Sequence, residues 1–317
     1  MKRVLSLLLV VLLAFSALTG CAASGETQQD SGKYTIIAAV YPVYDWLKNI
    51  TDGAENVEVE LLVDGGADLH SYQPTADDMV RISHSDMFVY VGGVSDAWVG
   101  DAMNSIVSRD KTDVVDLLTL LGDKVKEEEE VEGMQPEEEE EEEGAKDEHV
   151  WLSLRNAEAL CKGLSKSLEQ HNEANAALYR KNTDAYLKKL DALDKRYSEA
   201  LYDRKYDTLL FADRFPFRYL TDDYDIRYYA AFAGCSAESE ASFETVAFLS
   251  QKLNELKLPA VITIDGSDQK IAKTVLSTAD SDAEILTLDS MQSAKTDGDS
   301  YLSVMESNLE VLKKALL

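Results

Sequence analysis

Short apolar runs alternate along this chain with segments that have helical spacing. In the first half, strands are predicted over 34–40, 57–63, 87–91 and 112–117, with helices over 42–51, 76–83, 96–107 and 154–171. In the second half, strands are predicted over 208–212, 226–232, 260–264 and 284–288, with helices from 216 and over 242–256, 269–279 and 300–316. Because strand and helix alternate in both halves, the pattern indicates parallel βαβ units.

A long helix is predicted between the two halves. The segment from Leu164 to Phe215 contains neither Gly nor Pro, and its apolar residues recur at helical spacing from Tyr179 to Leu201. This predicts one amphipathic helix of roughly 30 residues or more, about 45 Å long at 1.5 Å per residue. A coiled coil is the alternative, but no heptad pattern persists. The predicted fold class is therefore α/β, with two similar lobes, each with a roughly four-stranded parallel sheet flanked by helices, joined by one long rigid helix.

The N-terminus has the pattern of an export signal. Lys2 and Arg3 precede an apolar run from Val4 to Leu18, and Leu18-Thr19-Gly20-Cys21 matches a lipoprotein cleavage box. An uncleaved signal anchor is the alternative, but the apolar run is shorter than the ~20 residues that span a bilayer. We therefore expect a signal peptide over 1–20, lipidation of Cys21, and a flexible tether over 21–33. This places a bacterial protein on the extracellular face of the cell membrane, anchored by lipid.

The remaining boundaries follow from the same pattern. We expect an N-terminal lobe over 34–165, a linker helix over 166–205 and a C-terminal lobe over 206–317. Cys161 and Cys235 remain after the anchor, so no disulfide framework is predicted, and whether these two pair stays open.

Charge is strongly negative and concentrated in one segment. The formal net charge is −28, and seven consecutive glutamates stand at 137–143. Nucleic acid is excluded as a partner, because a polyanion would be repelled. The segment 126–148 is predicted to be a solvated, disordered loop that serves either solubility or the weak collection of cations.

Candidate chemistry lies where predicted strands end or helices begin. His70 follows the second strand and His149 precedes a helix, while Asp213 and Asp289 follow strands of the second half. If the carboxyl ends of the two sheets face each other, all four reach the crevice between the lobes. Two imidazoles with one or two carboxylates suit Zn²⁺, and also Mn²⁺ or Fe²⁺.

Several motifs carry a resemblance to a known family. They are the lipobox, Gly66-Ala-Asp-Leu-His70-Ser-Tyr-Gln-Pro-Thr75, Tyr90-Val-Gly-Gly93 with Trp98, Asp147-Glu-His149-Val-Trp151, and Leu288-Asp289-Ser followed by Gly298-Asp-Ser-Tyr301. In this order they resemble the zinc/manganese-binding lipoproteins of bacterial metal ABC importers, the solute-binding components of cluster A-I type. The resemblance covers essentially the whole mature chain. It implies a metal between two lobes, with His70 and His149 as first-lobe ligands and Asp289 as a second-lobe ligand.

One position departs from the family pattern. The third family ligand, a His or Glu, shortly precedes an Ala-Phe-x-Tyr sequence, and ungapped matching from Phe217 and Tyr219 puts Arg214 there. A guanidinium has no acceptor for a cation, so a one-residue insertion that places Asp213 at this position is preferred. If Arg214 faces the site, pairing with Glu238, Glu240 or Asp289 is expected. Cys235 is a further candidate ligand.

Together these features predict a monomeric solute-binding lipoprotein that captures Zn²⁺ and delivers it to an ABC transporter permease. Binding of Mn²⁺ or Fe²⁺ is the alternative, and the chain is not expected to be an enzyme. A metallohydrolase would need a general base and substrate pocket beside the metal, and an adhesin or structural lipoprotein would use the metal only for folding. Binding is expected to weaken as pH falls through the ordinary histidine range.

Overall fold

The fold was analysed in a computed structural model. It describes residues 32–63, 67–105, 112–135, 144–236, 240–292 and 298–317. Residues from Tyr34 to Leu317 form one compact unit. The expected signal peptide, Cys21, most of the tether and the seven consecutive glutamates lie outside the described residues.

The first sheet contains four parallel strands in the order β2-β1-β3-β4. The strands are β1 (Tyr34–Ala38), β2 (Val57–Leu61), β3 (Met87–Tyr90) and β4 (Asp113–Asp116), and the helices after them are α2 (Tyr41–Ile50), α3 (Ala76–His84), α4 (Trp98–Ser105) and α5 (Leu117–Leu121). Thr75 caps α3 as a capping box, because its hydroxyl accepts from the Asp78 amide and the Asp78 side chain accepts from the Thr75 amide. The polar loop that carries His70 lies between β2 and this cap.

The second sheet repeats the architecture, with four parallel strands in the order β6-β5-β7-β8. Its strands are β5 (Thr208–Phe215), β6 (Arg227–Ala233), β7 (Ala260–Ile264) and β8 (Glu284–Leu288), and its helices are α8 (Arg218–Asp223), α9 (Phe243–Leu256), α10 (Lys270–Ala279) and α11 (Tyr301–Leu316). The register between β5 and β6 shifts between Phe211 and Arg214, so β5 carries one extra residue there. Bulges of this kind redirect side chains near functional sites.

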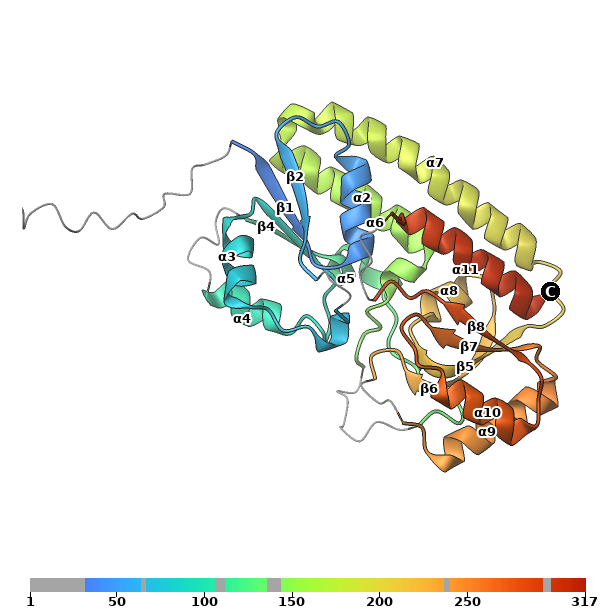
Figure 1. Cartoon of the computed structure of the whole chain (residues 1–317). Helices are drawn as coiled ribbons and strands as arrows, with labels where there is room; N and C mark the ends of the chain where they lie inside the picture. The colour runs from blue at the N-terminus through green and yellow to red at the C-terminus, as the bar shows by residue number, and fades with distance from the viewer. Residues whose placement is uncertain (1–31, 64–66, 106–111, 136–143, 237–239, 293–297) are drawn as a thin grey trace, which may run out of the picture. The chain divides into compact units, whose positions relative to one another are not determined.

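The long helix is present as α7, which covers 26 residues from Ala176 to Leu201. It follows α6 (Leu154–His171), whose C-cap is Asn172, and a short 3₁₀ turn separates the two. Its apolar stripe from Tyr179 to Leu201 is buried, as the spacing predicted. Helix α7 packs against α2 and α6 beside the first sheet and against α11 beside the second (Figure 1). The two sheets therefore share one rigid support.

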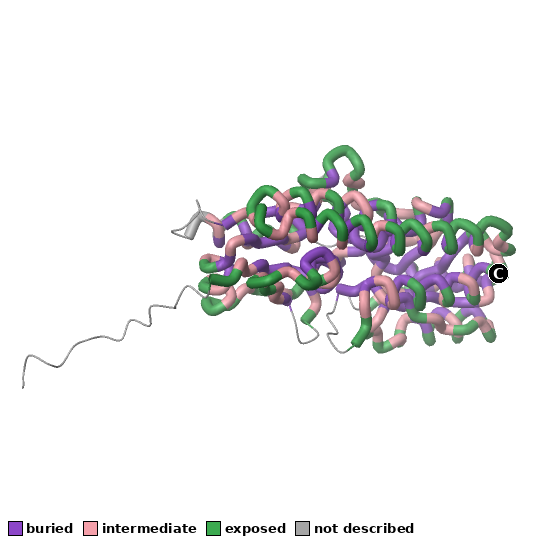
Figure 2. The backbone as a smooth tube through the Cα atoms, turned by 90° about the horizontal axis from the view of Figure 1, so that it is seen from above, coloured by how far each residue is buried: buried purple, intermediate pink, exposed green. Residues whose placement is uncertain are grey.

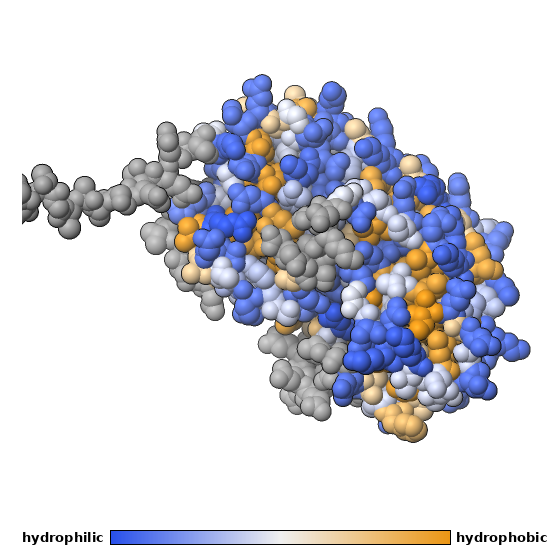
Figure 3. Space-filling view, viewed as in Figure 1, coloured by the Kyte–Doolittle hydropathy of each residue, from blue (hydrophilic) through white to orange (hydrophobic). Residues whose placement is uncertain are grey.

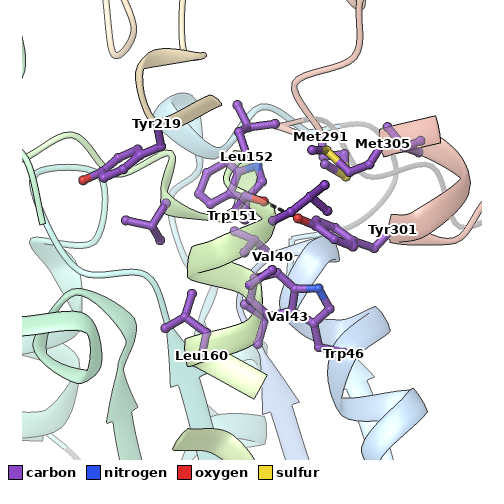
Figure 4. Packing of buried hydrophobic residues seen from close by; sticks show 14 of the residues in the cluster. Val40, Val43, Trp46, Trp151, Leu152, Leu160, Tyr219, Met291, Tyr301 and Met305 are labelled. Carbon is purple, nitrogen blue, oxygen red and sulfur yellow. Dashed lines mark hydrogen bonds between the residues drawn. The ribbon is translucent and has the colours of Figure 1, made fainter. Parts of the chain in front are cut away.

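A continuous apolar core joins the two sheets around Trp151. The indole N–H of Trp151 donates to the Ser290 carbonyl at 2.9 Å, and the Tyr301 hydroxyl donates to the Trp151 carbonyl at 2.7 Å. Trp46 from α2 lies edge-on to Tyr301 with ring centroids 5.2 Å apart (Figure 4). All three aromatic side chains are fully buried. This packing fixes the segment around His149 against the loop after β8.

The ends of the acidic segment are hydrogen-bonded, which differs from the solvated loop expected over 126–148. Glu127 and Lys146 form an antiparallel bridge, and the Gln135 amide donates to the Ala231 carbonyl of β6. Lys126 also forms an ion pair with Asp222 of α8. Backbone pairing and nearby cations thus hold the described part of this segment against the second sheet.

Exposed positions lie mainly on the outer turns of the backbone, with buried positions toward the interior (Figure 2). Hydrophilic residues cover much of the face shown in Figure 3, in keeping with the high formal charge. Among the described residues, no helix is both long enough and apolar enough to cross a bilayer.

Candidate metal site

His70 lies on a 3₁₀ turn, Leu69–Ser71, in the loop that follows β2. Asp68 caps this turn, because its carboxylate accepts from the His70 amide at 3.0 Å. On the imidazole itself, Nδ1 lies 2.7 Å from the Ser95 hydroxyl and 3.9 Å from a Glu148 carboxylate oxygen. The ring is therefore held at its Nδ1 edge, and its Nε2 atom points to other partners.

His149 directly precedes a second 3₁₀ turn, Val150–Leu152, and is fully buried. One Asp147 carboxylate oxygen accepts from the His149 amide at 2.8 Å and lies 3.0 Å from its Nδ1. The ring also packs edge-on to Trp151, with centroids 5.4 Å apart. A carboxylate on Nδ1 is the usual partner that orients a metal-binding imidazole in proteins.

The two histidines direct their Nε2 atoms at the same point. These two atoms are 3.2 Å apart, and the Gln292 side-chain nitrogen lies 2.7 Å from His70 Nε2 and 2.6 Å from His149 Nε2. An amide nitrogen donates, so a ring that accepts from it through Nε2 carries its proton on Nδ1, beside Ser95 in His70 and beside Asp147 in His149. That tautomer presents an Nε2 lone pair to a cation.

This spacing suits tetrahedral coordination. Two ligands at a Zn–N distance of about 2.0 Å are separated by about 3.3 Å along the edge of a tetrahedron. The observed separation of 3.2 Å between the Nε2 atoms of His70 and His149 is close to that value. One dication can therefore contact both rings without a large movement of either.

Burial keeps the His70 imidazole unprotonated. Desolvation, followed by repulsion from His149, lowers the pKa of His70 to about 3. Burial also raises the pKa of the Glu148 carboxyl, one oxygen of which has no hydrogen-bond partner among the described residues. A neutral imidazole beside a buried acid is an environment that favours an incoming cation.

Arg214 is drawn across to the first lobe. Its guanidinium donates to the Asp68 carboxylate at 2.9 Å. Burial alone would raise the pKa of Asp68, but the hydrogen bond and positive charge of Arg214 outweigh burial and lower it. Among the described residues, Arg214 thus pairs with the residue that caps the His70 turn; Glu238, one of the partners expected from sequence, lies outside the described residues. The extra residue in β5 immediately precedes Arg214.

The two aspartates of the second lobe lie at the ends of their strands. The Asp213 carboxylate accepts from the Arg214 amide at 3.0 Å and from the Ile264 amide at 3.4 Å. Asp289 accepts from the Met291 amide at 2.8 Å and opens the loop that carries Gln292 to the histidines. Neither aspartate falls within the groups of converging ligand atoms found among the described residues.

Two groups of side chains bring their ligand atoms together. Within each group, the atoms lie within 4.8 Å of one another. One contains His70, His149 and Cys235, and the other contains Glu128, Asp147 and His149. Cys161 and Cys235 are both free thiols. Sequence reasoning missed Gln292 and Glu128, because neither belongs to a motif and each reaches the site only through long-range folding.

Comparison with known proteins places the chain in a family of metal-uptake proteins. The sequence model of the family described as "Zinc-uptake complex component A periplasmic" matches residues 36–315. Zinc-binding lipoprotein AdcA of Streptococcus pneumoniae is 32% identical over 310 residues, covering 96% of this chain and 60% of AdcA. The chain thus spans about 60% of the length of that relative.

Other similar proteins align over nearly their full length. Manganese ABC transporter substrate-binding lipoprotein scaA of Streptococcus gordonii is 27% identical, covering 98% of this chain and 97% of the relative. The crystal structure of the Zn(II)-bound ZnuA-like domain of Streptococcus pneumoniae AdcA superimposes with a TM-score of 0.71 at 28% identity. It covers 90% of this chain and 99% of that domain. The two-lobed fold is therefore that of solute-binding proteins.

Proposed function

The chain belongs to the family of zinc-uptake complex component A proteins, and we propose that it captures Zn²⁺ between its two lobes and delivers it to an ABC transporter permease. His70 and His149 supply two imidazole ligands in this proposal, and Asp289 supplies a carboxylate from the second lobe. Asp213 is the weaker carboxylate candidate, because it already accepts from two backbone amides. The protein acts as a carrier and not as an enzyme.

The observation that supports this proposal is the convergence of His70 Nε2 and His149 Nε2 on one point. Each ring is anchored at Nδ1 by an oxygen atom, from Ser95 in one case and Asp147 in the other. Similarly anchored imidazoles with a tetrahedral spacing are a preformed half of a zinc site. The names of similar proteins point to zinc and also to manganese. Two nitrogen ligands favour zinc over manganese, which prefers oxygen.

The lipid anchor and the membrane partner belong to the same proposal. Cys21 follows a lipobox, and several similar proteins are named lipoproteins of metal ABC transporters. We infer that Cys21 is lipidated and holds a monomeric carrier on the extracellular face of the membrane, beside its permease.

Isothermal titration of metal-stripped protein with Zn²⁺ tests the site. The His70→Ala, His149→Ala double variant is expected to lose zinc binding by at least about 1,000-fold, since both imidazole ligands are removed. A His84→Ala, His171→Ala variant is the matched control, because these two residues lie outside the site on α3 and α6. Unchanged zinc affinity in the first variant would exclude the proposed site.

A further inference from the structure

A cysteine from the second lobe lies beside the two histidines. Cys235 follows Gly234 at the end of β6, and its Sγ and one nitrogen each of His70 and His149 lie within 4.8 Å of one another. Both cysteines of the described residues are free, but Cys161 is fully buried within α6. Only Cys235 is therefore positioned to contribute a sulfur ligand to the histidine pair.

Gly234 allows this approach of the second lobe to the first. A Cβ atom at this position would lie 2.9 Å from Cε1 of the His149 ring and 2.9 Å from the Phe215 carbonyl oxygen. Any larger residue would push the turn after β6 away from the ring. The absence of a side chain at position 234 thus brings the next residue, Cys235, against the imidazole.

The end of β5 leaves room for such a ligand. Arg214 is bonded to Asp68, and the Asp213 carboxylate accepts from backbone amides of its own lobe. Two neutral imidazoles provide no negative charge to a bound dication. With the proposed Asp289 carboxylate they fill three of the four positions of a tetrahedral zinc site, and a thiolate is among the strongest donors that a protein offers for the position that is left.

We propose that Cys235 is a third protein ligand, completing a His70–His149–Cys235 set that selects Zn²⁺ over Mn²⁺. This inference rests on the function proposed above and specifies the chemistry of the same site. A tetrahedral zinc centre with Zn–N of about 2.0 Å and Zn–S of about 2.3 Å separates N and S by about 3.5 Å. Because the atoms already lie within 4.8 Å, a shift of about 1 Å closes the set.

Proton balance follows from the free thiol. The Cys235 S–H bond breaks as the Zn–S bond forms, and the proton passes to solvent. Asp289 or water takes the fourth position. The softness of sulfur gives the selectivity, since manganese is bound preferentially by carboxylate, carbonyl and water oxygens.

The competing arrangement is the group of Glu128, Asp147 and His149. It is richer in oxygen and would suit a harder cation. One Glu128 oxygen is buried without a hydrogen-bond partner among the described residues. Asp147, however, already holds the Nδ1 edge of His149, so a cation there would disrupt the anchor of that ring. The group with the thiol does not include Asp147.

Cobalt substitution tests the sulfur ligand directly. Metal-stripped protein kept under reductant is titrated with Co²⁺, and a near-ultraviolet thiolate-to-cobalt charge-transfer band is expected. Cys161→Ser should keep the band, whereas Cys235→Ser should lose it and retain weaker Co²⁺ binding through the imidazoles. Asp213→Asn should keep it as well, which separates the thiol from the carboxylate expected from sequence.

Affinity measurements complete the test. Cys235→Ser should weaken Zn²⁺ binding by about 100-fold or more and leave Mn²⁺ binding little changed. Loss of a residue that only hydrogen-bonds to a metal ligand typically costs about 10–100-fold, so loss of a ligand itself should cost at least as much. Three results would each overturn the inference and leave the proposed carrier function standing. They are a charge-transfer band that persists in Cys235→Ser, a wild-type protein that binds Zn²⁺ but shows no band, and equal affinities of the wild-type protein for Zn²⁺ and Mn²⁺. Failure of the wild-type protein to bind Zn²⁺ would instead refute the proposed function.

Discussion

Replacement of Gln292 by alanine is expected to raise the affinity for zinc. The Gln292 amide nitrogen lies within hydrogen-bond distance of both Nε2 atoms at which the ion is proposed to bind. The side chain is buried, so these hydrogen bonds are shielded from water. An incoming ion must displace the amide, and the cost of breaking its contacts reduces the observed binding free energy.

The magnitude follows from these two contacts. A buried hydrogen bond contributes about 1 kcal/mol, so two contribute about 2 kcal/mol to the metal-free state. A change of about 2 kcal/mol corresponds to roughly 30-fold in the dissociation constant. Water that enters the space left by the side chain would replace part of the hydrogen bonding to the imidazoles. The increase in zinc affinity would then be smaller, so about 10- to 30-fold is expected.

Competition with a chromophoric zinc chelator measures this change. Gln251→Ala on the exposed surface of α9 is the matched control and should leave the affinity as it is. An unchanged affinity in Gln292→Ala would show that the amide does not compete with the ion. A lower affinity would show that the Gln292 carbonyl oxygen is itself a ligand.

Two further predictions concern charge around His70. Burial lowers its pKa to about 3, so below pH 6.5 the unfolded chain binds a proton that the folded chain excludes, and stability falls as pH decreases. Between pH 7 and pH 5, the free energy of unfolding of the metal-free wild-type protein should fall by about 2 kcal/mol more than that of His70→Gln, as measured by urea denaturation. Equal losses in the two proteins would contradict this assignment. Arg214→Met should strengthen zinc binding by roughly tenfold, because it leaves the negative Asp68 carboxylate unpaired beside the site. Asp68→Asn should weaken binding by a similar factor, because it leaves the positive Arg214 guanidinium unpaired there. In chelator competition the double variant should return near wild type; changes of the same sign in both single variants would refute the electrostatic account.

Local patterns predicted the fold because they depend on short-range chemistry. Alternating strands and helices indicated two parallel sheets. The stripe from Tyr179 to Leu201 predicted the long helix. The 3₁₀ turn Glu173–Asn175, which interrupts the range expected for the linker helix, was not predicted, because no Gly or Pro marks it.

Of the residues whose ligand atoms converge, the sequence named His70, His149 and Cys235. His70 and His149 lie in motifs after or before regular elements, whereas Gln292 and Glu128 reach the site from separate segments that only the folded chain brings together. The Asp68–Arg214 pair spans 146 residues and depends on the extra residue in β5. The expected pH dependence also changes, because burial moves the pKa of His70 far below the ordinary histidine range.

The bonds between Trp151, Ser290 and Tyr301 bear on how cargo leaves. Swinging the halves apart would break two buried hydrogen bonds and separate Trp46 from Tyr301, all within one close-packed region. The short peptide from Asp289 to Gln292 contains Ser290 and contacts both rings through Gln292. A movement that lifts Gln292 from the rings would therefore also break the Trp151 bond, so release of the proposed cargo would be tied to the packing between the two sheets.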